Sequence, residues 1–143
     1  MPAIRFPDSA GLLLPLCKGH GQEFIFRTYA DLLWFAASYG FHLVRIQGRQ
    51  LPTKSTFVDT PNPINLEVFD NRGLYGNILM MALSQINSEK FTEDEELLAK
   101  LVEQHASLGA EALAQKLKEK TYSEQVAVLS SLLELKNEEP CLI

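Results

Sequence analysis

The sequence predicts a mainly α-helical, compact single domain of about five or six helices with at most a few short strands, so an α+β arrangement stays open. Two kinds of pattern favour helices: apolar residues recur at helical spacing over most of the chain, and capping signals precede several apolar runs. The length of 143 residues, with 46% hydrophobic content, suits one core and is too short for two ordinary ones. Residues 1–143 are therefore predicted to form one domain.

The chain is predicted to begin with a short extended segment at residues 4–6. Residues 7–9 then offer a helix start, followed by apolar side chains at helical spacing as far as Cys17. Pro15 interrupts this pattern, because an interior proline removes a backbone donor and clashes with the preceding turn. Two alternatives remain for this segment: a short helix that begins near Pro15, or an irregular structure.

Residues 28–40 are predicted to form an almost wholly buried helix. Thr28 and Asp31 have the spacing of a capping box, with Asp in place of the usual Glu, and Gly40 stands where a left-handed C-terminal residue is expected. The large apolar residues between them leave little room for a solvated face, so partners must surround the helix on more than one side. The candidate contacts to a second subunit or a partner protein are Trp34, Phe35 and Tyr39.

The segment after Gly40 is predicted to leave the helix. Residues 41–46 have the alternation and the branched side chains of a strand or extended arm. Residues 47–63 contain Gly48 and three prolines among polar residues, and they are predicted to form a long, mobile loop.

The middle of the chain is predicted to continue with a turn and a helix. A short apolar segment at residues 64–69 is closed by turn-forming residues at 70–73. Residues 74–86 then repeat apolar side chains at helical spacing.

The last third is predicted to hold the most regular helices. Thr92, three residues before a glutamate, is the expected cap of the first of them, and Gly109 is expected to interrupt it. Residues 110–120 continue as helix, with lysines toward the negative C-terminal end of the helix dipole. A last helix is expected from Ser123, with a frayed tail from about residue 137.

Charge is distributed unevenly along the chain. The formal net charge is −5, yet the residues through Lys54 include six basic and three acidic side chains, whereas the remainder includes seven and fifteen. An anionic partner is therefore expected to meet the N-terminal part of the protein.

One basic cluster is the candidate site for binding nucleic acid or a partner. Arginine forks beside a polar loop are typical of sites that hold phosphates or carboxylates. A plain solvated surface is the alternative, because this density of basic residues is ordinary. The candidate binding residues are Arg27, Arg45, Arg49 and Lys54, with Lys18 as a further neighbour.

No motif in the sequence predicts catalysis, a metal site or a cofactor. The three histidines and two cysteines lack the spacing of metal ligands. Cys17 follows a leucine-rich face, where a buried thiol is more common than a nucleophile, although a Cys/His pair that meets only in space stays open. We therefore expect a protein that is not an enzyme.

The sequence also favours a cytoplasmic protein without a membrane partner. Two cysteines do not make a disulfide framework, no export signal is recognisable, and no apolar stretch approaches the length of a membrane span.

Several segments, taken in order and spacing, point to one family. They are residues 4–7, 26–41, the basic stretch 49–52, residues 63–69 and residues 108–110. Together they resemble the family called Dnd system-associated protein 4, small proteins encoded beside bacterial DNA phosphorothioation modification and restriction genes. The resemblance implies a cytoplasmic accessory of a defence system that handles sulphur-marked DNA, and it brings no catalytic residues with it.

These observations predict a non-enzymatic accessory protein of a DNA phosphorothioation-type modification or restriction system, which acts in anti-phage defence by binding DNA or a DNA-bound partner. A protein-binding adaptor or regulator without nucleic-acid contact is the alternative. The expected partners are DNA, other proteins of the system and a second copy of the chain. An extended segment followed by two helices is also similar, by analogy, to the ribbon-helix-helix arrangement, in which strands from two subunits enter the major groove.

Overall fold

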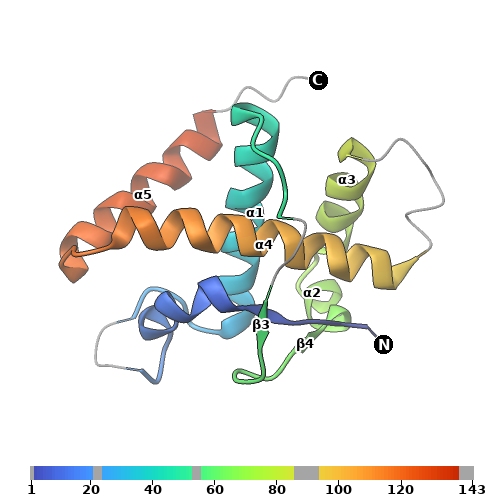
Figure 1. Ribbon diagram of the computed structural model, residues 1–143, viewed down its shortest axis with the longest axis horizontal. Coiled ribbons are helices and arrows are strands. Elements are labelled where there is room, and N and C mark those ends of the chain that lie inside the picture. The colour runs from blue at the N-terminus through green and yellow to red at the C-terminus, as the bar shows by residue number, and fades with distance from the viewer. Residues whose placement is uncertain (1, 21–23, 53–55, 86–93, 139–143) are drawn as a thin grey trace.

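Two long helices, α1 (Tyr29–Gln47) and α4 (Glu95–Leu117), cross at the centre of the molecule (Figure 1). The computed structural model describes residues 2–20, 24–52, 56–85 and 94–138. Within them the mainly α fold class is confirmed. The other helices are α2 (Leu66–Asn71), α3 (Tyr75–Gln85), α5 (Tyr122–Glu138) and two short 3-10 helices, η1 (Asp8–Leu12) and η2 (Leu14–Leu16).

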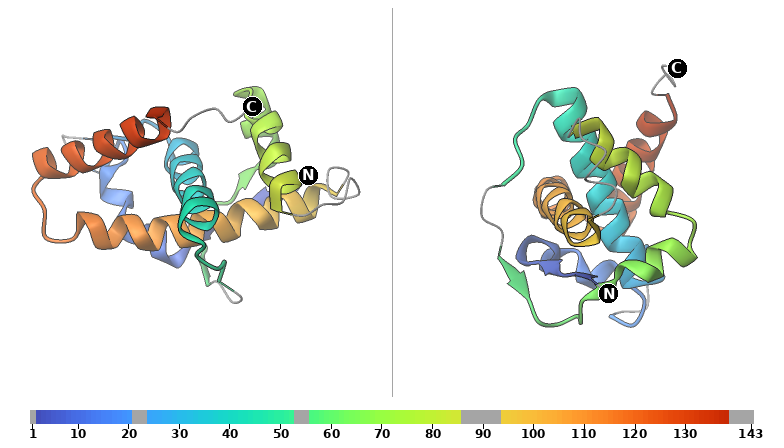
Figure 2. Two further views of the ribbon diagram at one scale, coloured as in Figure 1. Left: turned by 90° about the horizontal axis from the view of Figure 1, so that it is seen from above. Right: turned by 90° about the vertical axis from the view of Figure 1, so that its right-hand side faces the viewer.

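The remaining elements are arranged around this crossing. Seen from above, α5 and α3 lie on opposite sides of α1 (Figure 2). The N-terminal segment runs along α4 on the side away from the C-terminal end of α1 (Figure 2). The centre of the molecule is therefore covered by elements from both ends of the chain.

In the part of the chain that the structure describes, four strands of two residues each form two antiparallel pairs. Strand β1 (Ala3–Ile4) pairs antiparallel with β4 (Ile64–Asn65), and β2 (Phe6–Pro7) pairs antiparallel with β3 (Phe57–Val58). The predicted extended N-terminus is confirmed. Its partners lie in the same chain, which differs from the ribbon-helix-helix arrangement.

The N-terminal end of α1 was predicted correctly and its C-terminal end was not. The Thr28 side chain caps the helix by accepting a 3.1 Å hydrogen bond from the Asp31 backbone N–H. However, α1 continues through Gly40 to Gln47, and the left-handed residue after it is Gly48, with φ of 66°. Residues 41–46 are therefore helical, and the predicted strand or extended arm is wrong.

The physical reason is that Gly40 and Gly109 are packing residues at the crossing. A Cβ atom on Gly40 would lie 1.9 Å from the carbonyl oxygen of His105, and one on Gly109 would lie 1.8 Å from that of Ala36. The two helix backbones thus touch where neither residue has a side chain. For the same reason Gly109 does not interrupt α4, which is also a correction of the prediction.

The starts of the later helices differ from those predicted. Asp94 caps α4, since its carboxylate accepts hydrogen bonds from the backbone N–H groups of Glu96 and Leu97 at 3.1 and 3.2 Å. The predicted cap, Thr92, lies outside the described residues. Helix α5 begins at Tyr122, one residue before the predicted start.

The structure confirms the prediction for Pro15 and corrects in part those for residues 47–63 and the C-terminal tail. Pro15 lies in the first turn of η2, so the short helix near the proline is the alternative that the structure adopts. Part of the predicted loop at 47–63 forms β3, and α5 extends to Glu138 within the predicted tail. Mobility of the loop and fraying of the tail stay predictions.

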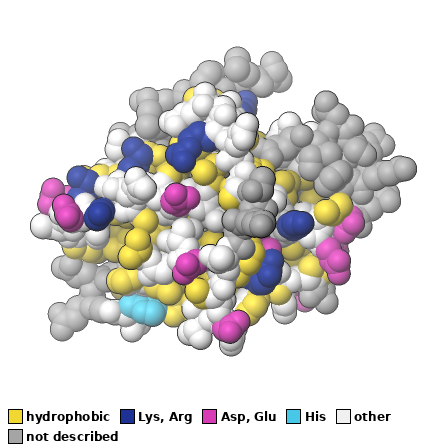
Figure 3. All heavy atoms as spheres, viewed as in Figure 1, with side chains coloured by type: hydrophobic (Ala, Val, Ile, Leu, Met, Phe, Trp, Pro, Cys, Tyr) yellow, Lys and Arg dark blue, Asp and Glu magenta, His cyan; other side chains and the backbone are white. Residues whose placement is uncertain are grey.

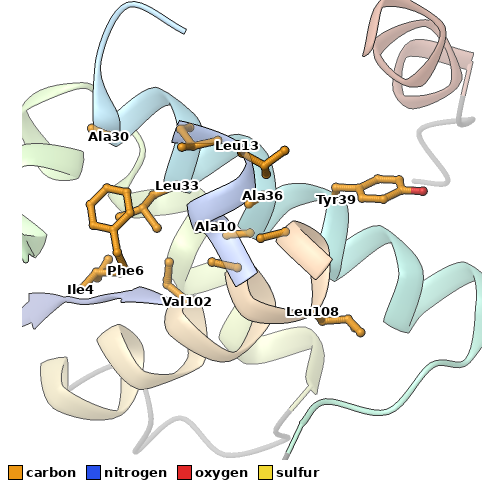
Figure 4. Close-up of a cluster of buried hydrophobic side chains, with 14 of the residues drawn as sticks. Ile4, Phe6, Ala10, Leu13, Ala30, Leu33, Ala36, Tyr39, Val102 and Leu108 are labelled. Atoms are coloured by element: carbon orange, nitrogen blue, oxygen red, sulfur yellow. The ribbon is translucent and has the colours of Figure 1, made fainter. Parts of the chain in front are cut away.

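The core is formed mainly by the N-terminal segment, α1 and α4 (Figure 4). Burial of the apolar side chains that these three segments contribute is the main force that holds them together. Members of this core that Figure 4 shows include Ile4, Phe6, Ala10, Leu13, Leu33, Ala36 and Val102.

His105 is fully buried in α4, close to the crossing. Its Nδ1–H donates to the Leu101 carbonyl oxygen at 2.8 Å, whereas Nε2 has no hydrogen-bond partner among the described residues. Burial lowers the pKa of the imidazole from its usual 6.5, and the bond to Leu101 opposes this only in part. The ring is therefore neutral in the folded protein at neutral pH.

We expect His105 to make stability depend on pH. Below pH of about 6.5 the unfolded chain takes up a proton that the folded protein does not, so the free energy of unfolding should fall by up to about 1.4 kcal/mol per pH unit between the two pKa values. Urea unfolding at several pH values from about 7.5 to about 5.5 measures how steeply the free energy of unfolding depends on pH. His105→Leu should make this dependence less steep, and an unchanged slope in this variant would contradict the expectation.

Candidate nucleic-acid or partner interface

The structure separates the predicted basic residues into two groups. Arg27 directly precedes α1, Arg45 lies in its last turn and Arg49 follows its end, and all three are exposed. At 1.5 Å per residue, Arg27 and Arg45 lie about 27 Å apart along the helix. Lys18 lies near Arg27, since its backbone N–H donates to the Phe26 carbonyl at 2.8 Å. Lys54 lies outside the described residues.

A cleft opens where the C-terminal ends of α1 and α4 diverge from their crossing. From Gly40 and Gly109 onward, over about two turns, the helices leave a cavity of about 300 Å³ between them, which we call the α1–α4 cleft. Lys and Arg side chains gather over the C-terminal half of α4, in the upper left of Figure 3. The cleft is lined by Tyr39, Leu43, Gln47, Arg49, Glu111, Ala112, Gln115 and Lys116.

Lys116 is the cleft residue that sequence reasoning missed. Its position in the last turn of α4 fits a cation that stabilises the helix dipole, and the sequence analysis gave it only that role. The crossing brings it to the same cleft as Arg49, which follows another helix. No local pattern reveals this, because the two residues meet only through the packing of α1 on α4.

Tyr39 connects the cleft to the core. The residue is only 9% exposed, and its ring stacks on that of His42, with centroids 6.2 Å apart. Its side chain points away from the other labelled core residues, with the hydroxyl at the outer end (Figure 4). Burial raises the pKa of this hydroxyl, and the nearby charge of Arg49 opposes the rise. Tyr39 is therefore a neutral hydrogen-bonding group beside a cation.

The other two predicted interface residues have partners within the chain. Trp34 is half-buried, and its ring centroid lies 6.4 Å from that of Phe69. Phe35 is half-buried too, with its centroid 5.6 Å from that of Phe26. Contacts of Trp34, Phe35 or Tyr39 with a second subunit stay a prediction.

The chemistry of the cleft suits one oxyanion. Arg49 and Lys116 contribute two positive charges and Glu111 one negative charge, and the two glutamine amides add neutral donors. The negative ends of two helix dipoles lie nearby and weaken the attraction for an anion. A single phosphate or carboxylate is therefore a better match than a highly charged ligand.

Cys17 has the properties of a packing residue. Its side chain is buried, and burial raises the pKa of the thiol to about 11, with a smaller contribution from the charge of Asp31. The thiol is thus protonated at neutral pH, whereas a nucleophile needs the thiolate. This confirms the interpretation of Cys17 as a buried small hydrophobe.

Among the described residues, no three side chains of His, Cys, Asp or Glu lie together as metal ligands would. None of the described helices is both long and apolar enough to cross a membrane.

Comparison with known proteins places the chain in a family. The sequence matches no curated protein and no solved structure. Residues 4–140 match the family described as DNA sulphur modification system-associated protein 4, which confirms the resemblance found in the sequence. Because this match spans nearly the whole chain, the protein belongs to the DNA sulphur modification system-associated protein 4 family.

Proposed function

We propose that this protein is a non-enzymatic accessory of a DNA sulphur modification system that contacts DNA, or a partner bound to DNA, through the α1–α4 cleft. Membership of the family supports the association with such a system. The observation that carries the proposal is that Arg49, in the segment after α1, and Lys116, in α4, line the same cleft. Exposed Arg45 in the last turn of α1 extends the basic surface beside it.

The distribution of charge makes this a local contact. With a net charge of −5, the protein repels DNA over most of its surface. At the C-terminal end of α4, however, Lys116 is followed by exposed Lys118 and Lys120, with Glu119 between them. Positioning of the protein by a few phosphate contacts is therefore favoured over coating of the duplex.

A protein-binding adaptor is the second candidate, and helix α3 favours it. Its Met80 side chain is 71% exposed and Leu83 is 41% exposed, so apolar area faces solvent. Exposed apolar area is typical of surfaces that contact other proteins. If the protein is such an adaptor, the cleft would bind an acidic side chain of the partner protein.

A salt titration of DNA binding tests the first candidate. Wild-type affinity for a short duplex, measured by fluorescence anisotropy, should fall steeply as salt rises because bound counterions are released. Arg49→Ala and Lys116→Ala should each weaken binding by about tenfold at low salt and lower the salt slope by about 0.9. Arg27→Ala, the same change at the other end of α1, should have a smaller effect.

Two results would count against this proposal. Absence of DNA binding by the wild-type protein at low salt would end the direct-contact version and leave the adaptor. Equal losses in Arg27→Ala and Arg49→Ala would show that the cleft is not the centre of the contact.

A further inference from the structure

We infer that the α1–α4 cleft is a built site for a single phosphate of the DNA backbone, in which the Tyr39 hydroxyl donates a hydrogen bond while Arg49 and Lys116 supply the charge. This inference rests on the proposed function and deepens it, because it assigns the ligand group and a specific role to Tyr39. It differs from a general basic patch in requiring a neutral donor that is held by a largely buried ring.

The strongest observation is the Tyr39 hydroxyl itself. The residue is nine-tenths buried and lines the cleft, and its hydroxyl, which is not one of the buried atoms, has no hydrogen-bond partner among the described residues. Tyrosines with an apolar ring in the core and a hydroxyl that reaches solvent are typical of contact surfaces. Phenylalanine would fill the same space in the core without the polar atom, so the hydroxyl is available for a ligand in the cleft.

The charge of the cleft agrees with one phosphodiester group. Arg49 and Lys116 together with Glu111 give the lining a formal charge of about +1 at neutral pH. A phosphodiester carries one negative charge, so a single group is neutralised. A second phosphate inside the cleft would lie close to the Glu111 carboxylate and be repelled.

The origin of the donors favours phosphate over carboxylate. Tyr39 belongs to α1, Arg49 to the segment after it and Lys116 to α4, so donors from three different segments line the cleft. The tetrahedral oxygens of phosphate can accept from several sides, whereas a carboxylate is planar and is typically held by one arginine fork. We therefore assign phosphate, and a carboxylate from an acidic partner becomes an outcome of the test.

The test compares Tyr39→Phe with Tyr75→Phe, the same substitution at a half-buried tyrosine at the start of α3. Loss of a hydrogen bond to a charged group should weaken binding by about tenfold. We expect Tyr39→Phe to show this loss both for a short DNA duplex and for inorganic phosphate, followed by NMR titration at constant ionic strength. Tyr75→Phe should bind both as the wild type does.

Three other results would each contradict the inference. If Tyr39→Phe binds DNA and inorganic phosphate like the wild type while Arg49→Ala remains impaired, the phosphate site is refuted and the proposed function stands. If acetate at equal ionic strength shifts the cleft resonances as strongly as phosphate, the site is one for carboxylates, which overturns the assignment. If the wild type binds no DNA, the direct-contact version of the proposed function fails, and so does the DNA backbone as the source of the phosphate.

Discussion

Gly109→Ala is expected to destabilise the protein by about 3 kcal/mol or more, as overpacking against a rigid backbone does. The new methyl group would lie 1.8 Å from the Ala36 carbonyl oxygen and 2.7 Å from the Gly40 backbone nitrogen. Neither atom can move alone, because both belong to the backbone of α1. The helices must separate, and the gain of about 1 kcal/mol in helix propensity cannot offset this. Urea unfolding monitored by circular dichroism measures the loss.

Gly76→Ala is the matched control for this substitution. Gly76 also lies in a helix, α3, but apart from its own stretch of helix no described atom lies within 4 Å of the position that its Cβ would occupy. Alanine there should leave stability unchanged or raise it by up to about 1 kcal/mol. A Gly109→Ala protein as stable as the wild type would show that the two helices do not touch at these glycines.

Glu103→Ala is expected to lower the free energy of unfolding by about 2–4 kcal/mol. Glu103 is a carboxylate in α4 with only 4% exposure, and it accepts three hydrogen bonds from Arg5: from the backbone N–H at 2.7 Å, from Nε at 2.9 Å and from Nη2 at 3.1 Å. The Arg5 guanidinium also lies 3.8 Å from the centre of the Phe57 ring in β3. One carboxylate thus fixes the N-terminal segment to α4, and its removal leaves a backbone donor without this partner.

Asp31→Ala provides the comparison, since it breaks an ion pair between two solvent-exposed side chains. Arg72 Nη1 lies 2.6 Å from Asp31 Oδ1, but the two side chains are 36% and 41% exposed. An exposed pair of this kind contributes about 1 kcal/mol or less. If Asp31→Ala and Glu103→Ala cost the same in urea unfolding, burial of the Glu103 carboxylate is not what makes its ion pair strong.

Local signals in the sequence predicted the ends of elements best. The Thr28 cap of α1 depends on residues three positions apart, so its geometry is contained in the sequence pattern. Gly40 was misread because a glycine that ends a helix and one that lets another helix approach have the same local appearance. Only the partner, Gly109, distinguishes them, and it lies on another helix.

The candidate site could be predicted only in part for a similar reason. Arg45 and Arg49 are close in sequence and lie at the same end of α1, whereas Arg27, which the sequence places in the same candidate cluster, lies at the other end of this helix. Lys116 belongs to the acidic half of the chain and joins Arg49 only after the helices cross. The sequence predicts Tyr39 as an apolar contact to a partner. A role for its hydroxyl in binding a ligand can be inferred only from its position in the cleft.

Our central proposal is that DNA binds at the α1–α4 cleft. Mapping the binding surface by NMR tests this proposal most directly. A short duplex added to isotope-labelled protein should shift the backbone resonances of the residues that line the cleft, with the largest changes at Tyr39, Arg49 and Lys116. The resonances of Arg27 and of the exposed face of α3 should change little. Shifts confined to α3 or to the Arg27 end of α1, with the cleft unaffected, would contradict the claim.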